Sequence, residues 1–355
     1  MPHGINQKNT LPFCNRAKSC RMALEKTAMN IELKPILTRF RAYQLGAPGS
    51  SFSYFANGHF TLIEARLTDK SYVSLANELK ACGKQNIDTL HITGWDQDHC
   101  DFKELQEILS TLQPMKIEYS GYVHDSENYK NCLNEILRYR DAKRKAGQAM
   151  VARRIDPPYV RSLEDAKGLG YNDIIFHPKQ EFSGSNDNST VKLYRGGMFN
   201  VASLGDVEHP NIGSMLRKCR TFQTEVDVLI LAHHGSDNDV NSKNFFELVR
   251  PAIVVCSADY DNQYGHPHDE VRRVLHELGI GVFTTKTGDV LVESVPNHRK
   301  EYRVTNFNSN TTGVSSQKSF VSKKFHLLSM NADTIRNRLH PGFKGLSNCL
   351  SSQAE

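Results

Sequence analysis

Two acidic residues and a histidine lie close together in the segment GWDQDHCDF, directly after an apolar run. These residues are Asp96, Asp98 and His99, and the run before them, IDTLHIT (87–93), predicts a buried strand. Carboxylate oxygens beside an imidazole nitrogen suit a divalent cation such as Mn²⁺, Mg²⁺ or Zn²⁺. The segment therefore predicts metal ligands, and the simpler alternative is an acidic loop exposed to solvent.

Three further groups of polar residues follow predicted strands in the second half of the chain. They are Asp206 directly after Gly205, the pair His233 and His234 after an apolar run, and His266 and His268 before a predicted helix. Glycine lets the backbone turn tightly before the acid. Consecutive histidines at a strand exit point opposite ways, so at most one is expected to ligate a given ion. Taken alone, these groups are also typical of a Gly-Asp turn, buried structural histidines and a helix-entry loop.

The elements that must position these groups alternate along the chain. Apolar residues at helical spacing predict helices at 71–83, 101–113 and 127–155, with short β-rich runs between turn residues from Ile36 onward. This alternation predicts a mixed α/β fold. Because layered α/β sheets build sites at the carboxyl ends of their strands, we expect the four groups to converge at one edge.

Composition and charge limit the classes of protein that remain. The chain has 355 residues and 39% hydrophobic content. Its longest apolar runs are far shorter than the about 20 residues that a membrane helix needs. We therefore expect a soluble protein without membrane insertion, and the lack of a secretory signal in the first thirty residues favours the cytoplasm. Eight scattered cysteines without a Cys-x-x-Cys pair argue against a zinc finger or a disulfide framework.

Positive charge is concentrated in two segments although the net charge is only +5. Residues 130–161 and residues 298–355 each carry nine Lys or Arg against three acids. Basic segments of this kind can hold a polyanion, so we expect nucleic acid to contact both of them. The expected contacts are Arg138, Arg144, Arg153 and Arg154, with Tyr129, Tyr139 and Tyr159 among them as candidates for base stacking. The alternatives are a solvated helix face and tyrosines that pack the helix onto the domain.

The order of four motifs resembles one known family over about residues 36–295. The motifs are TGWDQDH, NDNSTVKLYRGGMFNVASLGDVE, DVLILAHHGS and YGHPH. Together they resemble the metallo-β-lactamase-fold domain of ComEC-type competence proteins and their stand-alone soluble relatives. The resemblance implies a four-layered αββα sandwich, and the family includes metal-dependent nucleases and phosphodiesterases.

The resemblance also implies roles for individual residues. The implied metal ligands are Asp96, Asp98, His99, Asp206 and either His233 or His234. The implied catalytic residues are Asp98, His234, His266 and His268, of which the last two could protonate the leaving group or hold phosphoryl oxygens. The implied substrate contacts near the centre are Asn188, Ser189 and Ser236.

This chain departs from the family pattern near the first metal position. Gly94 stands where the family has the first histidine of its metal motif, and His91 on the preceding strand is a poor substitute. Glu64 and Arg66 stand in a segment where the family has an aspartate and a glycine. One divalent ion, Mn²⁺ or Zn²⁺, is therefore expected more securely than two. His177 is a weak candidate for an additional ligand.

These observations predict three regions and one leading function. We expect an N-terminal extension (1–28), a metallo-β-lactamase-fold domain (29–297) with a basic helical insert at about 125–165, and a basic C-terminal tail rich in Ser and Asn (298–355). The predicted function is metal-dependent hydrolysis of phosphodiester bonds, most plausibly in DNA or RNA. The alternatives are hydrolysis of a small nucleotide or phosphodiester signal, and a catalytically degenerate module that binds nucleic acid or docks a partner.

Overall fold

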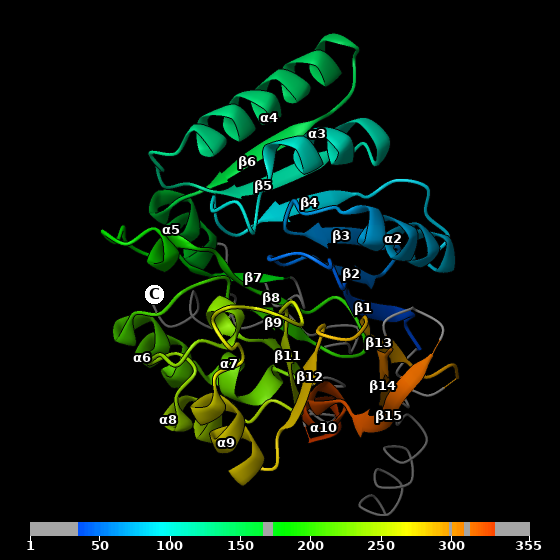
Figure 1. Cartoon of the computed structure of the whole chain (residues 1–355), viewed down its shortest axis with the longest axis vertical. Coiled ribbons are helices and arrows are strands. Elements are labelled where there is room, and N and C mark those ends of the chain that lie inside the picture. The colour runs from blue at the N-terminus through cyan, green and yellow to red at the C-terminus, as the bar shows by residue number, and fades with distance from the viewer. Residues whose placement is uncertain (1–34, 166–172, 298–299, 309–312, 331–355) are drawn as a thin grey trace, which may run out of the picture. The chain divides into compact units, whose positions relative to one another are not determined.

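The computed structural model describes residues 35–165, 173–297, 300–308 and 313–330. The expected N-terminal extension (1–28) lies outside these residues, as does the last part of the expected tail (331–355). The described strands form two sheets (Figure 1). The larger sheet has nine strands in the order β15-β14-β13-β1-β2-β3-β4-β5-β6, and the smaller has six in the order β12-β11-β10-β9-β8-β7.

The strand bounds follow the short β-rich runs of the sequence. The larger sheet comprises β1 (Thr38–Ala42), β2 (Phe52–Ala56), β3 (His59–Ile63), β4 (Thr89–Ile92), β5 (Lys116–Ser120), β6 (Val151–Ile155), β13 (Val290–Ser294), β14 (Glu301–Phe307) and β15 (Val314–Val321). The smaller sheet comprises β7 (Ile174–His177), β8 (Val191–Tyr194), β9 (Val201–Ser203), β10 (Val228–Ile230), β11 (Ile253–Cys256) and β12 (Gly281–Thr284).

All but the last of the described helices connect these strands. The helices are α2 (Asp69–Ala81), α3 (Phe102–Thr111), α4 (Glu127–Lys145), α5 (Pro157–Asp165), α6 (Pro210–Lys218), α7 (Arg220–Glu225), α8 (Lys243–Val249), α9 (Asp269–Glu277) and α10 (Lys323–Met330), with short 3₁₀ helices η1 (Asn186–Asn188) and η2 (Ala232–Gly235). Local signals in the sequence explain several of their starts. The side chains of Thr68, Asp101 and Ser126 accept backbone hydrogen bonds at the starts of α2, α3 and α4.

Three hydrophobic cores arrange these elements in four layers. Side chains of α2, α3 and α4 pack against one face of the larger sheet, and those of α6, α7, α8 and α9 pack against the smaller sheet. A third core lies between the two sheets. Along β10, Val228 and Ile230 face the other sheet whereas Leu229 faces the helices, as expected for successive residues of a strand. The expected αββα sandwich is confirmed.

Parallel pairing brings the carboxyl ends of the central strands to the same side of each sheet. Strands β3 to β6 are parallel neighbours in the larger sheet, as are β9 to β12 in the smaller one. A bridge between Ala65 and Cys100 continues the β3–β4 pairing past the strand ends. The segments that follow β4, β9, β10 and β11 carry the polar groups identified in the sequence.

The predicted helix at 127–155 was too long. Helix α4 ends at Lys145, Gly147 has φ +77°, and residues Val151–Ile155 form β6 against β5. Three basic residues in the last turn followed by a glycine are typical of a helix C-terminus. The expected basic insert at about 125–165 is therefore not helical throughout, because its β6 is the edge strand of the larger sheet.

The expected boundary at residue 297 also has to be moved. Strand β14 pairs with β13, and β15 pairs with β14, so the larger sheet continues well past this position. Tyr302 and Val304 of β14 are fully buried in the core between the sheets. The sequence of 298–330 did not predict this part of the sheet, because β15 is a mostly exposed edge strand with few apolar residues.

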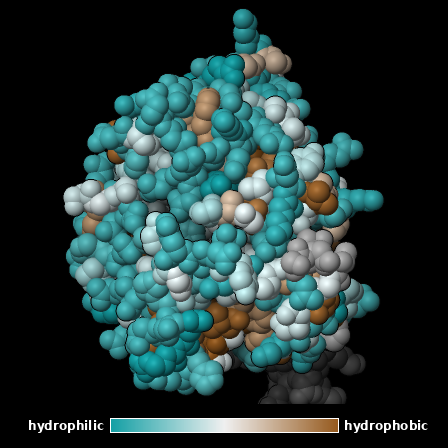
Figure 2. All heavy atoms as spheres, in the orientation of Figure 1, coloured by the Kyte–Doolittle hydropathy of each residue, from teal (hydrophilic) through white to brown (hydrophobic). Residues whose placement is uncertain are grey.

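Hydrophilic residues predominate on the face drawn in Figure 2, and the hydrophobic ones lie there in small separate groups. Among the described residues, no helix is both long and apolar enough to cross a lipid bilayer.

Replacing Tyr302 with alanine tests the place of β14 in the core. The Tyr302 ring packs against Phe199 and Phe320, with ring centroids 5.0 and 5.7 Å away. Loss of a buried aromatic ring leaves a cavity, so the free energy of unfolding should fall by about 3 kcal/mol. Denaturant unfolding measures this change. Val314→Ala on exposed β15 is the control and should change stability by less than about 0.5 kcal/mol. Equal small effects would contradict the assignment of β14 to the core.

Candidate metal centre

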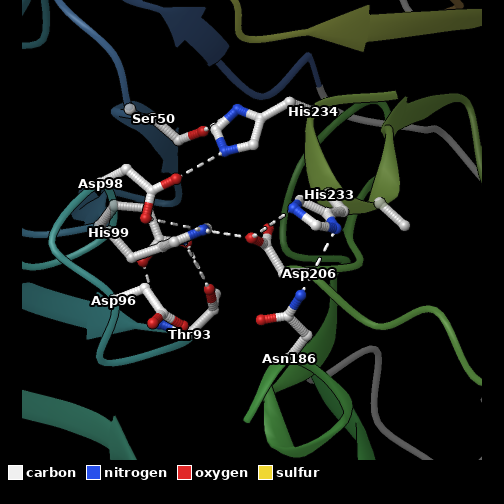
Figure 3. A network of polar contacts seen from close by, with 12 residues as sticks. Ser50, Thr93, Asp96, Asp98, His99, Asn186, Asp206, His233 and His234 are labelled. Atoms are coloured by element: carbon white, nitrogen blue, oxygen red, sulfur yellow. Dashed lines mark hydrogen bonds and ion pairs between the residues drawn. The ribbon is translucent and has the colours of Figure 1, made fainter. Parts of the chain in front are cut away.

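Four potential ligand atoms meet where the two sheets present their strand ends. Asp98 and His99 follow β4, Asp206 follows β9, and His234 lies in η2 after β10. One ligand atom from each of these residues lies within 4.8 Å of those of the other three (Figure 3). The larger sheet therefore contributes one carboxylate and one imidazole, and the smaller sheet contributes the other two groups.

The Glu64 carboxylate contacts the imidazole of His99 on the side that faces away from Asp206. His99 Nδ1 lies 3.2 Å from Glu64 Oε1, and the same carboxylate accepts hydrogen bonds from the Thr93 backbone and hydroxyl. His99 Nε2 lies 2.9 Å from Asp206 Oδ2 but is not aligned for a hydrogen bond. This buried nitrogen has no hydrogen-bond partner in the part of the chain that the structure describes. A carboxylate behind a histidine fixes the tautomer that offers Nε2 to a metal.

His234 has the same arrangement. Its Nδ1 donates to the carbonyl oxygen of Ser257 at 2.8 Å, and its Nε2 lies 3.1 Å from Asp98 Oδ2. In both histidines the outer nitrogen is therefore occupied and the inner nitrogen faces a carboxylate. Metal-binding histidines commonly have this outer hydrogen bond.

His233 lies beside this group but is not part of it. Its Nδ1 bonds to Glu208 Oε1 at 2.8 Å, and its Nε2 lies 4.0 Å from Asp206 Oδ2. Both histidines have positive φ, 44° for His233 and 53° for His234, which is uncommon for residues with a Cβ. This backbone turns His234 toward Asp98 while His233 faces Asp206 from another side (Figure 3).

A glycine is required directly before Asp206. Gly205 has φ +55°, and a Cβ at this position would lie 2.7 Å from the Cβ of Ser189. The tight approach lets the strand end beside the neighbouring loop and places the Asp206 carboxylate next to His99.

Opposite charges dominate the electrostatics of the four groups. Burial opposes a charge on His99, but Asp206, Glu64 and Asp98 outweigh it and raise the pKa of His99 well above its usual value. Burial likewise opposes a charge on His234, yet the hydrogen bond to Asp98 and the charge of Asp206 raise the pKa of His234. Burial would raise the pKa of Asp206, but His99 lowers it. The carboxylates thus require nearby positive charge.

The donor set fits a divalent cation. Two carboxylate oxygens and two imidazole nitrogens at these separations suit Zn²⁺ or Mn²⁺ better than Ca²⁺, because Ca²⁺ is typically bound by oxygen atoms alone. The unpartnered Nε2 of buried His99 supports the same conclusion. Asp98, His99, Asp206 and His234 are the residues that would hold the ion.

Asp96 lies outside this donor group. Its Oδ1 is 3.3 Å from His124 Nε2, and Figure 3 shows its carboxylate directed away from Asp206. A Cβ on Gly94 would lie 3.4 Å from the Ser189 hydroxyl and 3.9 Å from the His99 ring. The space beside Gly94 is thus bordered by the Ser189 hydroxyl and the His99 ring.

His91 and His177 are engaged elsewhere. The two ring nitrogens of His91 contact Glu118 Oε2 and Thr190 Oγ1, at 3.0 and 2.8 Å. His177 Nε2 contacts the carbonyl oxygen of Asp187 at 2.7 Å, and burial lowers the pKa of His177 to about 4. Neither belongs to the donor group.

The structure separates the expected catalytic histidines of the YGHPH motif. The His266 ring stacks on that of His234 with centroids 6.1 Å apart and planes within 4°, and burial followed by neighbouring imidazoles lowers the pKa of His266 to about 4. His268 Nδ1 accepts from the Asp237 amide, and its Nε2 donates to the Tyr264 carbonyl oxygen. His268 therefore braces the loop with both nitrogens.

The expected polar contacts Asn188, Ser189 and Ser236 lie close to the centre but are buried. The Asn188 amide bonds to the backbone of Phe182 and Gly184. Ser236 donates to Glu208 Oε1, which also accepts from His233. These contacts indicate that Asn188 shapes a loop and that Ser236 supports Glu208.

The four expected arginines all lie at the β6 edge of the larger sheet, on β6 itself or on α4. Arg144 donates to the carbonyl oxygen of Met150, just before β6, and Arg138 pairs with Glu135 on exposed α4. Arg153 and Arg154 lie near the carboxyl end of β6, where Arg154 donates to the Gly121 carbonyl oxygen. This end is two strands from β4, or about 10 Å. The structure therefore brings only the second pair toward the donor group.

Two residues near the centre were not anticipated from the sequence. His124 follows the carboxyl end of β5 and contacts Asp96, and a histidine shortly after a parallel strand was the available signal. Tyr264 lies in the YGHPH loop, where it stacks on His266. The tyrosines expected to stack on bases are already engaged, because Tyr129 packs on Trp95 and the Arg153 guanidinium lies over Tyr159.

Comparison with known proteins gives one match in sequence. No protein-family model matches the chain. The chain is 26% identical over 212 residues to ComE operon protein 3 of Bacillus subtilis (strain 168), which covers 58% of this chain and 24% of that protein. The chain thus spans about a quarter of its relative. The resemblance to ComEC-type proteins is supported by this match.

Solved structures with a related arrangement share little sequence. Igni18, a metallo hydrolase from the archaeon Ignicoccus hospitalis KIN4/I, is 13% identical with a TM-score of 0.38, over 73% of this chain and 100% of that one. Tm1679, a metal-dependent hydrolase of the β-lactamase superfamily, is 12% identical with a TM-score of 0.40, over 71% and 98% of the two chains.

Glu64→Gln should weaken metal binding. The NH2 group of the amide must face either the Thr93 backbone N–H or the Nδ1 of His99, and either placement loosens the contact that orients His99, so metal affinity should fall about 10- to 100-fold. Metal titration by calorimetry measures it. Glu78→Gln is the matched control, since buried Glu78 pairs with Arg39 and Arg41 and does not contact the donor group. It should lower stability and leave metal affinity unchanged, and equal losses of affinity in both variants would contradict the role of Glu64.

We also expect one divalent ion per chain. After loading with Mn²⁺ or Zn²⁺ and removal of free metal, elemental analysis should give a ratio near one, because Asp96 faces His124 and Gly94 offers no ligand. Asp96→Ala should keep this ratio, whereas Asp206→Ala should lower it to less than about 0.2. A ratio of two that falls to one in Asp96→Ala would show that Asp96 is a ligand.

Proposed function

We propose that this protein is a divalent-metal-dependent hydrolase of phosphodiester bonds, with DNA or RNA as its substrate. One observation carries the proposal: His99 and His234 have their outer nitrogens bonded and their inner nitrogens facing the carboxylates of Asp206 and Asp98. This is the arrangement of a metal centre. The sequence match to ComE operon protein 3 supports the phosphodiester assignment through the resemblance to ComEC-type proteins.

A bound divalent cation lowers the pKa of its water toward 7 and polarises a phosphoryl oxygen. Asp98, His99, Asp206 and His234 would hold this cation, Mn²⁺ or Zn²⁺. Their side chains come from both sheets, so the substrate phosphate must approach along the shared edge.

His233 is placed to contact the substrate. Glu208 occupies its Nδ1, and Ser236 donates to the same carboxylate oxygen, so the ring orientation is fixed from behind. The inner nitrogen of His233 is directed toward Asp206 and is available to a phosphoryl oxygen at this edge. This assignment takes the place of His268, which together with His266 was expected to protonate the leaving group or hold phosphoryl oxygens, because both nitrogens of His268 are bonded to the backbone.

Positive charge on the same edge supports a nucleic-acid substrate. Both Arg153 and Arg154 are exposed residues near the end of β6. Contacts with phosphates neighbouring the scissile one would add affinity that falls with salt. A small phosphodiester is the second candidate, favoured by the limited size of the cavity beside the donor group, about 460 Å³.

Asp98→Ala and Asp206→Ala should abolish hydrolysis by removing metal ligands. We expect the catalytic efficiency to fall about 100-fold or more in either variant, and chelation of the wild type to have the same effect. Rates are measured with single- and double-stranded DNA, RNA and cyclic dinucleotides in parallel with Mn²⁺, Mg²⁺ and Zn²⁺. Asp96→Ala is the matched control and should lose less than about tenfold.

Retention of DNA at low salt should change little in the two alanine variants, because it depends on arginines rather than on the ion. Absence of hydrolysis of every substrate by metal-loaded wild type would contradict the proposed function. It would favour the binding-module alternative if DNA were still retained.

A further inference from the structure

A cavity of about 460 Å³ opens directly beside the donor group. Asp98, His233 and His234 line one side of it, and the loop between β11 and α9 lines the other. A group attached to a phosphate bound at the donor atoms would therefore extend into this cavity. Its volume is within the range of pockets that hold small ligands or one unit of a larger one.

The lining of this cavity does not suit a chain of phosphates. Among its described lining residues there is no lysine or arginine, whereas Asp98 and Asp259 are acidic. A second phosphate in the cavity would meet no lysine or arginine there and would face these carboxylates. An uncharged group avoids that repulsion, so the geometry favours a neutral part of the substrate.

Three stacked aromatic rings, those of His234, His266 and Tyr264, extend from the donor group to the cavity wall. The His266 ring is stacked on His234, and the Tyr264 ring is stacked on His266 with centroids 5.7 Å apart and planes 24° apart. The Tyr264 ring orientation thus follows that of a donor histidine. A planar group next to the bound phosphate would meet rings already aligned for stacking.

Tyr264 is held in place although it is largely exposed. Its exposure is 66%, so packing in the core does not explain the position of the ring. His268 donates from Nε2 to the Tyr264 carbonyl oxygen at 3.0 Å, and Asn262 Oδ1 accepts from the His266 amide. These hydrogen bonds fix the conformation of the loop between β11 and α9 that carries Tyr264. An exposed aromatic ring on a braced loop beside a candidate active site is typical of a ligand-stacking surface.

We propose that Tyr264 is the stacking surface for an unpaired nucleobase adjacent to the scissile phosphodiester. The substrate is then a single-stranded nucleic acid or a small nucleotide diester, not an intact duplex, since a base within a duplex is stacked on its neighbours and unavailable to the ring. This inference rests on the proposed function for the phosphodiester and adds the chemical class of the group beside it.

Binding of matched oligonucleotides tests the proposal. Fluorescence anisotropy at fixed salt compares a thymidine hexamer, an abasic hexamer with the same phosphates, a thymidine dinucleotide and a duplex, with Mn²⁺ and with chelator. The wild type should bind the thymidine ligands about tenfold more tightly than the abasic hexamer. Tyr264→Ala should abolish this preference without changing abasic binding, and Tyr264→Phe should retain it.

Tyr260→Ala is the control variant. Tyr260 lies on the same loop with 67% exposure but does not line the cavity, so its removal should leave base preference unchanged. Because both tyrosines are exposed, thermal unfolding of both variants should match the wild type. A preference that also falls in Tyr260→Ala would point to a general surface effect and overturn the assignment of Tyr264.

Cleavage is measured separately so that the two proposals can fail independently. Base preference that depends on Tyr264 without any cleavage would overturn the proposed hydrolysis and support the stacking site. Two results would overturn the stacking site. One is cleavage of the thymidine and abasic hexamers at equal rates, and the other is tighter binding of the duplex than of single strands. Tighter binding of the dinucleotide than of the hexamer would identify a small nucleotide diester, rather than a nucleic acid, as the ligand whose base stacks on Tyr264.

Discussion

Burial of two carboxylates at one point is the constraint that shapes the centre of this protein. Asp98 comes from the larger sheet and Asp206 from the smaller, and burial opposes the charge of both, with a smaller opposing contribution from Asp98 at Asp206. The imidazoles balance them crosswise: His99 of the larger sheet faces Asp206, and His234 of the smaller sheet faces Asp98. Positive charge at this point, on histidine or on a bound cation, therefore links the two sheets.

Local backbone strain is the cost of bringing these groups together. Glu64, His233 and His234 all have positive φ, a conformation that costs on the order of 1 kcal/mol or more for a residue with a side chain. Each is held by other contacts: Glu64 by Thr93 and His99, and the histidines by Glu208 and Ser257. Strain that persists against such a cost is common at functional sites, and here it coincides with the donor group.

The sequence predicted the donor group better than its surroundings. Asp98, His99, Asp206 and one of the paired histidines follow strands, and strand ends of parallel sheets meet at one edge whatever the loops do. The alternation also predicted a mixed α/β fold, whereas the αββα layers were implied by the resemblance to ComEC-type proteins. By contrast, the pairing of Asp96 with His124 depends on where two loops fold, and β15 has an exposed polar sequence that lacks the apolar alternation of a buried strand. The sequence contains no local signal for β15, and for Asp96 and His124 it indicates only that each follows a strand.

A centre with one ion depends more on protein groups than a centre with two. A second ion would stabilise the leaving oxygen, but here Gly94 offers no ligand and Asp96 faces His124. The missing stabilisation must then come from hydrogen bonds to the phosphate and from binding of parts of the substrate that lie away from the phosphate. The fixed ring of His233 can contribute the first, and the aligned rings of His266 and Tyr264 the second. On the proposed function, the absence of a ligand at Gly94 and the aligned rings beside the donor group would therefore act together.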